Sequence, residues 1–131
     1  MGLIYLDACV LIYAHEGSPA CAQRILEKMD AQTDARFAVS PLVKLECLVG
    51  PMRSGNLVLQ RSYEAALARL LLVDMPEDVY LQAAELRARF SLKTPDALHL
   101  ACAQHHRCTA LWTNDERLAK ASHGLASNVV E

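Results

Sequence analysis

Short apolar runs alternate along the chain with longer segments in which apolar residues recur every three or four positions. The short runs are typical of buried strands, and they lie at residues 3–6, 37–39, 71–73, 110–112 and 128–130. The longer segments have the helical period, and they lie at residues 8–14, 19–29, 41–49, 57–70, 76–90, 94–106 and 117–122. This alternation predicts an α/β fold in which helices cover both faces of a parallel sheet. It does not predict the strand order.

Several helices are expected to begin at a hydroxyl residue followed by proline. The pairs are Ser18-Pro19, Ser40-Pro41 and Thr94-Pro95. A serine or threonine hydroxyl can cap the first turn, and proline fits the first helical position because the N–H that it lacks has no partner there. Gly50-Pro51 is expected to end the helix that begins near Pro41, which leaves residues 52–56 as a loop.

The overall composition bounds the class of protein. A length of 131 residues suits a single domain over residues 1–131. No apolar run reaches the ~18 residues that cross a bilayer, and the first residues lack the basic start and cleavage site of a signal peptide. The five cysteines have no paired spacing, which favours free thiols in a reducing compartment. We therefore expect a cytoplasmic protein with no membrane association. The net charge of −2 neither indicates nor excludes a nucleic-acid partner.

Four acidic residues stand out by their positions. Asp7 ends the first strand, Asp115 follows the strand at 110–112, and Glu46 and Asp96 lie on predicted helices. Ligands of parallel sheets bind beyond the carboxyl ends of the strands, so we expect these four side chains to converge there. Two carboxylates ~4 Å apart repel by about 1 kcal/mol even in water, and a divalent cation removes that penalty. Mg²⁺ and Mn²⁺ prefer oxygen ligands, and such a site activates water to attack a phosphodiester.

Each of these acids also has a structural explanation. Asp7 and Asp115 could cap the helices that follow them. Asp96 is favoured by the helix dipole near a helix N-terminus. Glu46 borders a helix face formed by Leu42, Leu45 and Val49, and it could be a solvated edge residue.

Four segments that contain these acids resemble the PIN-domain family, and within it the VapC toxins. They are residues 4–12 (IYLDACVLI), 40–47 (SPLVKLEC), 94–101 (TPDALHLA) and 111–115 (LWTND). The segments occur in the order and at the separations of the family, and the resemblance covers essentially the whole chain. It implies a three-layer α/β/α sandwich around a central parallel sheet.

The resemblance also implies the activity and the site. VapC proteins are metal-dependent endoribonucleases that hydrolyse RNA phosphodiester bonds, and they are the toxins of type II toxin–antitoxin pairs. By this likeness the catalytic and metal-binding residues are Asp7, Glu46, Asp96 and Asp115, with Asp7 and Asp96 as core ligands of Mg²⁺ or Mn²⁺. Thr113 would orient the site by hydrogen bonding. Where the family often has serine or threonine two residues after the first aspartate, this chain has Cys9, so we do not assign that role to it.

The partners implied by the resemblance are RNA, a cognate antitoxin and a second copy of the chain in a homodimer. An antitoxin's C-terminal segment typically lies across the active-site groove, and residues 52–70 would form a projecting clip that helps to grip it. Candidate contacts to RNA phosphates are Arg53, Arg61, Arg69, Arg87, Arg89 and Lys93. Each of these is otherwise an ordinary solvated charge.

Two alternatives place the chemistry on other residues. A metal-independent ribonuclease would use histidines as acid and base, and the candidates are His15, His99, His105 and His106. We expect a structural role for His99, one helical turn after Asp96, although it could support the acids. A zinc site would use Cys102, His105, His106 and Cys108, but these residues crowd one helix end and lack a second half of the site.

Three further classes of protein have features that this sequence can be expected to show or to lack. An aspartyl-phosphate phosphatase needs a second aspartate two residues after the first, where this chain has Cys9. A receiver domain carries its acceptor aspartate at the end of a later strand. A catalytically silent PIN-like module that binds RNA or protein is the main alternative, and the full set of four acids argues against it.

Overall fold

The computed structural model describes residues 2–129, and a five-stranded parallel sheet forms its centre. The strands are β1 (Gly2–Leu6), β2 (Ala35–Val39), β3 (Leu71–Leu72), β4 (Ala110–Thr113) and β5 (Ala126–Asn128). Their order across the sheet is β3-β2-β1-β4-β5, and every neighbouring pair is parallel.

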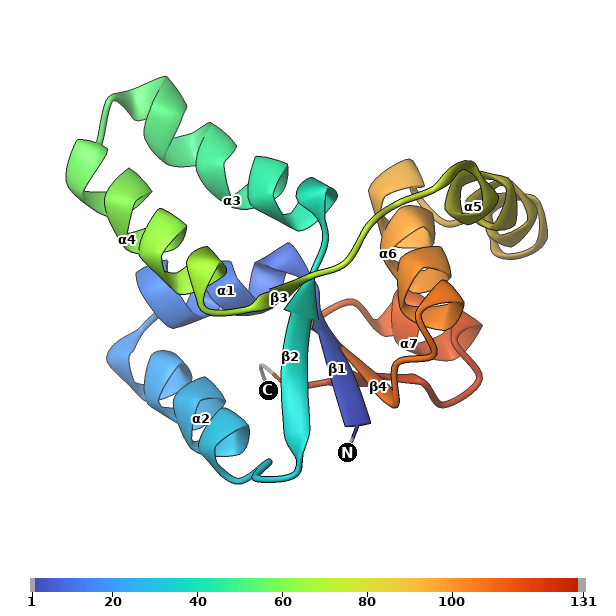
Figure 1. Cartoon of the computed structure of the whole chain (residues 1–131), viewed down its shortest axis with the longest axis horizontal. Coiled ribbons are helices and arrows are strands. Elements are labelled where there is room, and N and C mark those ends of the chain that lie inside the picture. Colours follow the sequence, from blue (N-terminus) through green and yellow to red (C-terminus); the bar gives the residue numbers. More distant parts are fainter. Residues whose placement is uncertain (1, 130–131) are drawn as a thin grey trace.

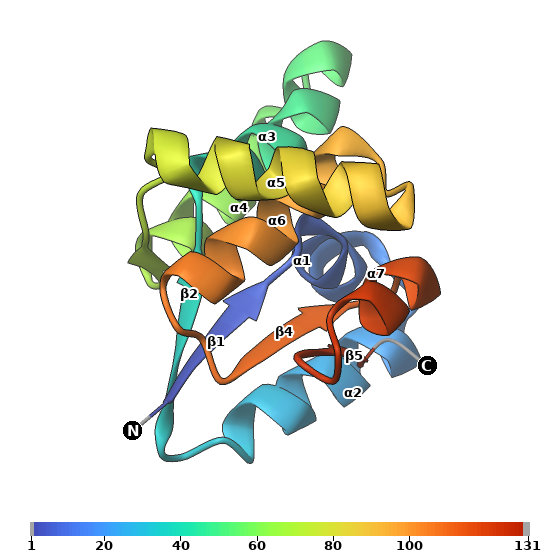
Figure 2. The same cartoon turned by 90° about the vertical axis from the view of Figure 1, so that its right-hand side faces the viewer.

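Helices cover both faces of this sheet. They are α1 (Ala8–Glu16), α2 (Pro19–Asp30), α3 (Pro41–Ser54), α4 (Leu57–Ala68), α5 (Glu77–Phe90), α6 (Thr94–His105) and α7 (Glu116–Ala121). Helices α1 to α4 lie on one side of the sheet and α5 to α7 on the other (Figures 1 and 2). The predicted α/β/α sandwich with a central parallel sheet is therefore confirmed.

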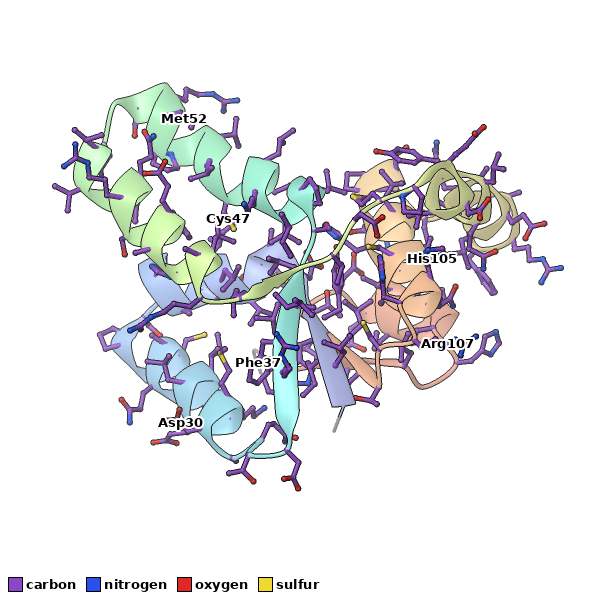
Figure 3. The ribbon with its side chains drawn as sticks, viewed as in Figure 1. Asp30, Phe37, Cys47, Met52, His105 and Arg107 are labelled. Atoms are coloured by element: carbon purple, nitrogen blue, oxygen red, sulfur yellow. The ribbon has the colours of Figure 1, made fainter. Side chains whose placement is uncertain are left out.

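The hydrophobic core lies between the sheet and these two helical layers. Strand β1 is central, and Tyr5 and Leu6 are completely buried because helices pack on both of its faces. Helix α6 is buried along most of its length and contributes Leu100 and Ala101 to the same core. Figure 3 shows the side chains that fill the space between the layers. Burying a leucine-sized side chain contributes about 1.5–3 kcal/mol, so this packing fixes β1 and α6 firmly relative to each other.

The strand order reverses between β1 and β4. The chain passes from β1 to β2 and β3 on one side, and it then crosses back to β4 and β5 on the other. In open parallel sheets, ligands bind beyond the carboxyl ends of the strands at such a reversal. The fold therefore directs attention to the residues that directly follow β1 and β4.

The prediction that Gly50-Pro51 ends a helix is wrong. Helix α3 continues to Ser54 with Pro51 inside it, and it ends at Gly55, whose φ of 70° lies in the left-handed region that favours glycine. Proline in a helix interior loses one hydrogen bond and strains the turn before it. Here Pro51 is buried where α3 packs against α4, and this packing outweighs the local preference. Residues 52–54 are consequently helical rather than a loop.

The ends of other elements differ in smaller ways. Ser18 and Ser40 cap α2 and α3 as predicted, with side chains that accept hydrogen bonds from Cys21 N and Val43 N. Thr94 does not cap α6, because the helix begins at Thr94 itself and Lys93 occupies the cap position without a side-chain bond. The last strand begins at Ala126 instead of Asn128, and position 130 of the predicted strand lies outside the described residues.

Across residues 2–129, no helix is both long and apolar enough to cross a membrane.

Candidate functional site

Asp7 is held at the carboxyl end of β1 by a threonine on β4. Its side chain is almost completely buried, with 7% of the residue exposed. The Thr113 hydroxyl donates a hydrogen bond of 2.9 Å to Asp7 Oδ2. Asp7 occupies the N-cap position of α1, yet its side chain makes no capping hydrogen bond. The capping explanation is therefore wrong for Asp7, and the buried carboxylate has another reason to be there.

Asp115 follows β4 and does cap the next helix. Its Oδ1 accepts a hydrogen bond of 2.9 Å from Arg117 N. Its own N–H donates to Thr113 Oγ1 over 3.1 Å. The Thr113 side chain, which is completely buried, therefore connects the two aspartates that follow β1 and β4. Capping engages Oδ1 of Asp115.

Glu46 and Asp96 approach this sheet edge from opposite helical layers. Glu46 lies on α3 and Asp96 in the first turn of α6. Together with Asp7 and Asp115 they line one open pocket of ≈ 400 Å³. The rest of its wall is largely apolar, and consists of Ala8, Cys9, Ile12, Leu45, Val49 and Asn114. The structure thus brings all four acids singled out by the sequence around one cavity.

Crowding of negative charge alters the acidity of this pocket. Burial and the neighbouring carboxylates of Asp115 and Asp7 raise the pKa of Asp96 to about 6. Burial, followed by the charge of Asp7, raises the pKa of the Cys9 thiol to about 12. The thiol is therefore protonated at neutral pH. The carboxylates repel one another, as expected for a site that needs a cation.

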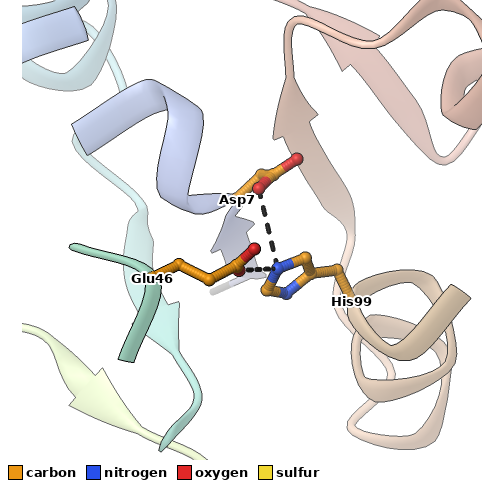
Figure 4. A group of neighbouring side chains, drawn as sticks. All are labelled: Asp7, Glu46 and His99. Carbon is orange, nitrogen blue, oxygen red and sulfur yellow. Dashed lines mark hydrogen bonds and ion pairs between the residues drawn. The ribbon is translucent and has the colours of Figure 1, made fainter. Parts of the chain in front are cut away.

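The sequence analysis preferred a structural role for His99 and kept support of the acids as an alternative, and the contacts of its ring favour the alternative. His99 is completely buried on α6, one turn after Asp96. Its Nε2 lies 2.5 Å from Glu46 Oε1 and 3.7 Å from Asp7 Oδ1, as Figure 4 shows. Burial alone lowers the pKa of His99, but the bond to Glu46 and the charges of Asp7, Glu46 and Asp96 outweigh it and raise that pKa. His99 therefore acts on the acids directly, beyond the structural role expected for it.

The other candidate histidines, His15, His105 and His106, do not line the acidic pocket. His15 pairs with Ser62 over 3.1 Å, and His106 Nε2 contacts the backbone oxygen of Asp74 at 2.7 Å. Within the described chain, the side chains that bring three potential metal ligands within 4.8 Å of one another are Asp7, Glu46 and His99. The zinc alternative at Cys102–Cys108, which the sequence analysis did not favour, is not among them.

The donor set of the pocket fits a hard divalent cation. Four carboxylates supply oxygen atoms, which are the ligands that Mg²⁺ and Mn²⁺ prefer. The pocket lining contains one sulfur atom, that of Cys9, against four carboxylates, so the donor set favours a hard cation over the softer metals that select thiolate. The raised pKa of Asp96 indicates that negative charge is in excess until a cation is bound.

The family of the chain follows from its sequence over nearly its full length. The model of the PIN domain matches residues 4–124, a range that contains all four acids. The chain belongs to the PIN-domain family. Comparison with curated proteins finds no match.

Solved structures share the fold of this PIN domain. A toxin–antitoxin complex from Klebsiella pneumoniae is 23% identical with a TM-score of 0.80, and the alignment covers 98% of both chains. VapBC2 from Rickettsia felis, bound to a promoter DNA fragment, is 19% identical with a TM-score of 0.81, and 96% of this chain and 98% of that chain are covered. VapC20 from Mycobacterium tuberculosis, a toxin that cleaves the sarcin–ricin loop, is 15% identical with a TM-score of 0.74 over 90% and 94%. At these identities the likeness establishes the fold.

Proposed function

We propose that this PIN domain is a metal-dependent endoribonuclease and the toxin of a type II toxin–antitoxin pair. Asp7, Glu46, Asp96 and Asp115 are proposed as its catalytic residues, and all four line one pocket. The convergence of these carboxylates at the strand-order reversal carries the proposal, because such a cluster is unfavourable unless a cation neutralises it. The similar structures that are toxins of such pairs support the biological role.

The same four side chains would hold Mg²⁺ or Mn²⁺. The cation, when bound, neutralises the carboxylates and activates water for hydrolysis of an RNA phosphodiester. Thr113 keeps Asp7 in place through the 2.9 Å hydrogen bond. Asp96 loses its proton near pH 6 and becomes a charged ligand above that pH. Ile12, Leu45 and Val49 form the apolar part of the wall beside these groups.

An apolar groove supports an antitoxin partner. Leu45 and Val49 belong to the wall of the acidic pocket and also to a neighbouring groove along α3, which is completed by Leu48, Met52 and Arg53. Leu45 is 62% exposed and Met52 55% exposed, although both are large apolar residues. Helices α3 and α4 project together from the body of the molecule (Figure 1). The proposed clip, residues 52–70, comprises the end of α3 and the whole of α4. An antitoxin segment lying along α3 would cover the groove and the acids at once.

The basic residues proposed for RNA binding differ in their surroundings. Arg53 lines the groove beside the acidic pocket. Lys93 directly precedes α6 and is exposed three positions before Asp96. Arg87 is engaged within the protein, since its Nε donates to Leu92 O over 3.0 Å. Arg53 and Lys93 are therefore the strongest candidates for phosphate contacts, ahead of Arg61, Arg69, Arg87 and Arg89.

The test is RNA cleavage by protein freed of any antitoxin, with Mg²⁺, with Mn²⁺ and with EDTA. We expect cleavage that requires the cation and leaves 5′-phosphate and 3′-hydroxyl ends. Asp7→Asn is expected to reduce cleavage to background. Asp34→Asn, an exposed acid at the opposite end of the strands, is the matched control and is expected to cleave normally. Cleavage that survives EDTA and leaves a cyclic phosphate would refute the proposal, and an absence of cleavage would favour a silent binding module.

A further inference from the structure

A buried chain of hydrogen bonds leads away from Glu46 into the core. His99 Nε2 contacts Glu46 Oε1 at 2.5 Å, and His99 Nδ1 lies 2.7 Å from the Tyr5 hydroxyl. The Tyr5 hydroxyl is 2.7 Å from Ser40 Oγ, and Ser40 Oγ accepts from Val43 N at the start of α3. These hydrogen bonds therefore connect Glu46 on α3 to α6 and β1, and they return to the first turn of α3.

The donors and acceptors of this chain are consistent along its whole length. A carboxylate only accepts hydrogen bonds, so Nε2 of His99 must carry a proton and donate to Glu46. When the imidazole is neutral, its Nδ1 accepts from the Tyr5 hydroxyl, and that oxygen accepts from Ser40. When the imidazole is charged, the Tyr5 and Ser40 bonds reverse direction. The bond from His99 to Glu46 is the same in both states, so it does not depend on the protonation of the ring.

Burial makes this arrangement costly unless it is complete. Tyr5, Ser40 and His99 are each 0% exposed. Polar groups in such surroundings lose their contacts with water and must be paired within the protein. Among the described residues, every buried side-chain nitrogen or oxygen has a hydrogen-bond partner. Apolar side chains at these three positions would avoid this cost. The hydrogen-bond chain ends at Glu46, an acid of the pocket, and this contact indicates the role of the buried polar groups.

Asp7 and Glu46, two of the acids that line the pocket, are held in different ways. Asp7 is oriented by Thr113 from β4. Glu46 is only partly buried, with 28% of its side chain exposed. Its carboxylate is at the end of a long, flexible side chain. Without His99, its carboxylate would be free to turn toward solvent. The bond to His99 keeps one of its oxygens next to Asp7, as Figure 4 shows, and leaves its other oxygen unused by this bond.

We propose that His99, fixed in turn by Tyr5 and Ser40, is a positioning residue that holds Glu46 beside Asp7 before the cation arrives. This inference rests on the proposed function, because a fixed Glu46 matters only if the pocket binds a metal ion. Its expected effect is tighter metal binding. Hydrogen-bond partners behind a metal ligand typically change metal affinity or activity by 10–100-fold. His99 does not bind the cation in this arrangement, since its Nε2 proton is directed at Glu46.

Mn²⁺ binding to the antitoxin-free protein, followed by the electron paramagnetic resonance of unbound Mn²⁺, tests the proposal without RNA. We expect Tyr5→Phe and His99→Leu to weaken Mn²⁺ binding by at least ~10-fold. His99→Gln, which keeps an N–H donor near Nε2, should recover much of the affinity. Tyr63→Phe is the matched control: Tyr63 is also completely buried, and its hydroxyl binds Glu16 on α1 instead of a pocket residue. It should bind Mn²⁺ as the wild type does.

Several results would overturn the proposal. One is a wild-type affinity for Mn²⁺ in Tyr5→Phe. This variant also provides the test if His99→Leu fails to fold. Another is a ¹⁴N coupling between His99 and bound Mn²⁺, which would make the imidazole a ligand. A third measurement is independent of metal: in the metal-free protein, the ¹⁵N-attached Nε2 proton of His99 should be visible and should shift in Glu46→Gln. If the wild type neither binds Mn²⁺ nor cleaves RNA, the proposed function fails, and this proton still decides whether His99 holds Glu46.

Discussion

Replacing Asp96 with asparagine should stabilise the protein when no metal is present. The pKa of Asp96 is raised from 3.8 to about 6, because burial and the charges of Asp115 and Asp7 disfavour its ionised form. A rise of about two pH units corresponds to ~3 kcal/mol of unfolding free energy. Because Asp96 is only half-buried, solvent screening reduces this to about 1–2 kcal/mol. Asparagine has the same shape without the charge, so it should recover that amount.

The gain should depend on pH in a defined way. The folded chain binds the Asp96 proton more tightly than the unfolded chain does. The contribution of this group to stability is therefore complete below pH 4, falls as the pH rises from about 4 to about 6, and is lost above that. The advantage of Asp96→Asn should be absent near pH 4 and full at pH 7.5. For a chain of this size, about 1–2 kcal/mol corresponds to a rise in Tm of roughly 3–8 °C.

Thermal unfolding in EDTA at pH 4, 6 and 7.5 is the measurement, and it separates two physical explanations. Asp78→Asn is the control, because Asp78 is an exposed acid in the first turn of α5 and does not line the acidic pocket. Loss of the Asp78 charge should lower the free energy of unfolding by about 0.3–1 kcal/mol, because that charge interacts favourably with the helix dipole. A lower Tm for Asp96→Asn than for the wild type at pH 7.5 would refute the crowding argument, since Asp96 would then behave as Asp78 does. Added Mg²⁺ should favour the wild type.

Other predictions concern the same pocket and its partners. Asp7→Asn should abolish RNA cleavage while circular dichroism remains unchanged; an active variant would remove Asp7 from the site. Mn²⁺ affinity should fall as the pH drops below about 6, where Asp96 becomes protonated, and calorimetry in two buffers should detect protons released on binding; affinity independent of pH would contradict this. Thr113→Val should destabilise the fold by about 1–3 kcal/mol and weaken Mn²⁺ binding ~10-fold, because Asp7 loses its 2.9 Å donor; wild-type affinity would show that Asp7 needs no support. Leu81→Asp should yield monomers in light scattering if the exposed face of α5 forms the proposed homodimer, and a persisting dimer would place that interface elsewhere.

The sequence predicted the fold class and the convergence of the acids for related reasons. Alternating strands and helices indicate a parallel sheet, and carboxyl ends of parallel strands share one edge, which places Asp7 near Asp115. The sequence determined the places of Glu46 and Asp96 less firmly, because helical periodicity does not show whether a side chain is directed toward that edge, and the resemblance to the family supported the expectation.

Two features lay beyond the sequence for physical reasons. The Tyr5–His99 bond joins residues 94 positions apart, and no local pattern encodes so distant a contact. The sequence placed Leu42, Leu45 and Val49 on one helix face without showing what that face meets, and Leu45 and Val49 are 62% and 44% exposed and line the pocket. An apolar stripe looks the same in sequence whether it meets the core or a ligand. The extension of α3 past Pro51 was missed because tertiary packing overrode the local preference.

The reversal of strand order between β1 and β4 also governs when the site can exist during synthesis. Strand β1 pairs with β4 across more than a hundred residues, and Asp7 receives its hydrogen bond from a residue 106 positions later. Contacts so distant in sequence form late, because the chain must close a long loop first. A nascent chain that ends before β4 contains Asp7 and Glu46 but lacks Thr113 and Asp115. We therefore expect ribosome-bound fragments of this protein to be harmless to RNA, with nuclease activity arising only once the last strands have left the ribosome.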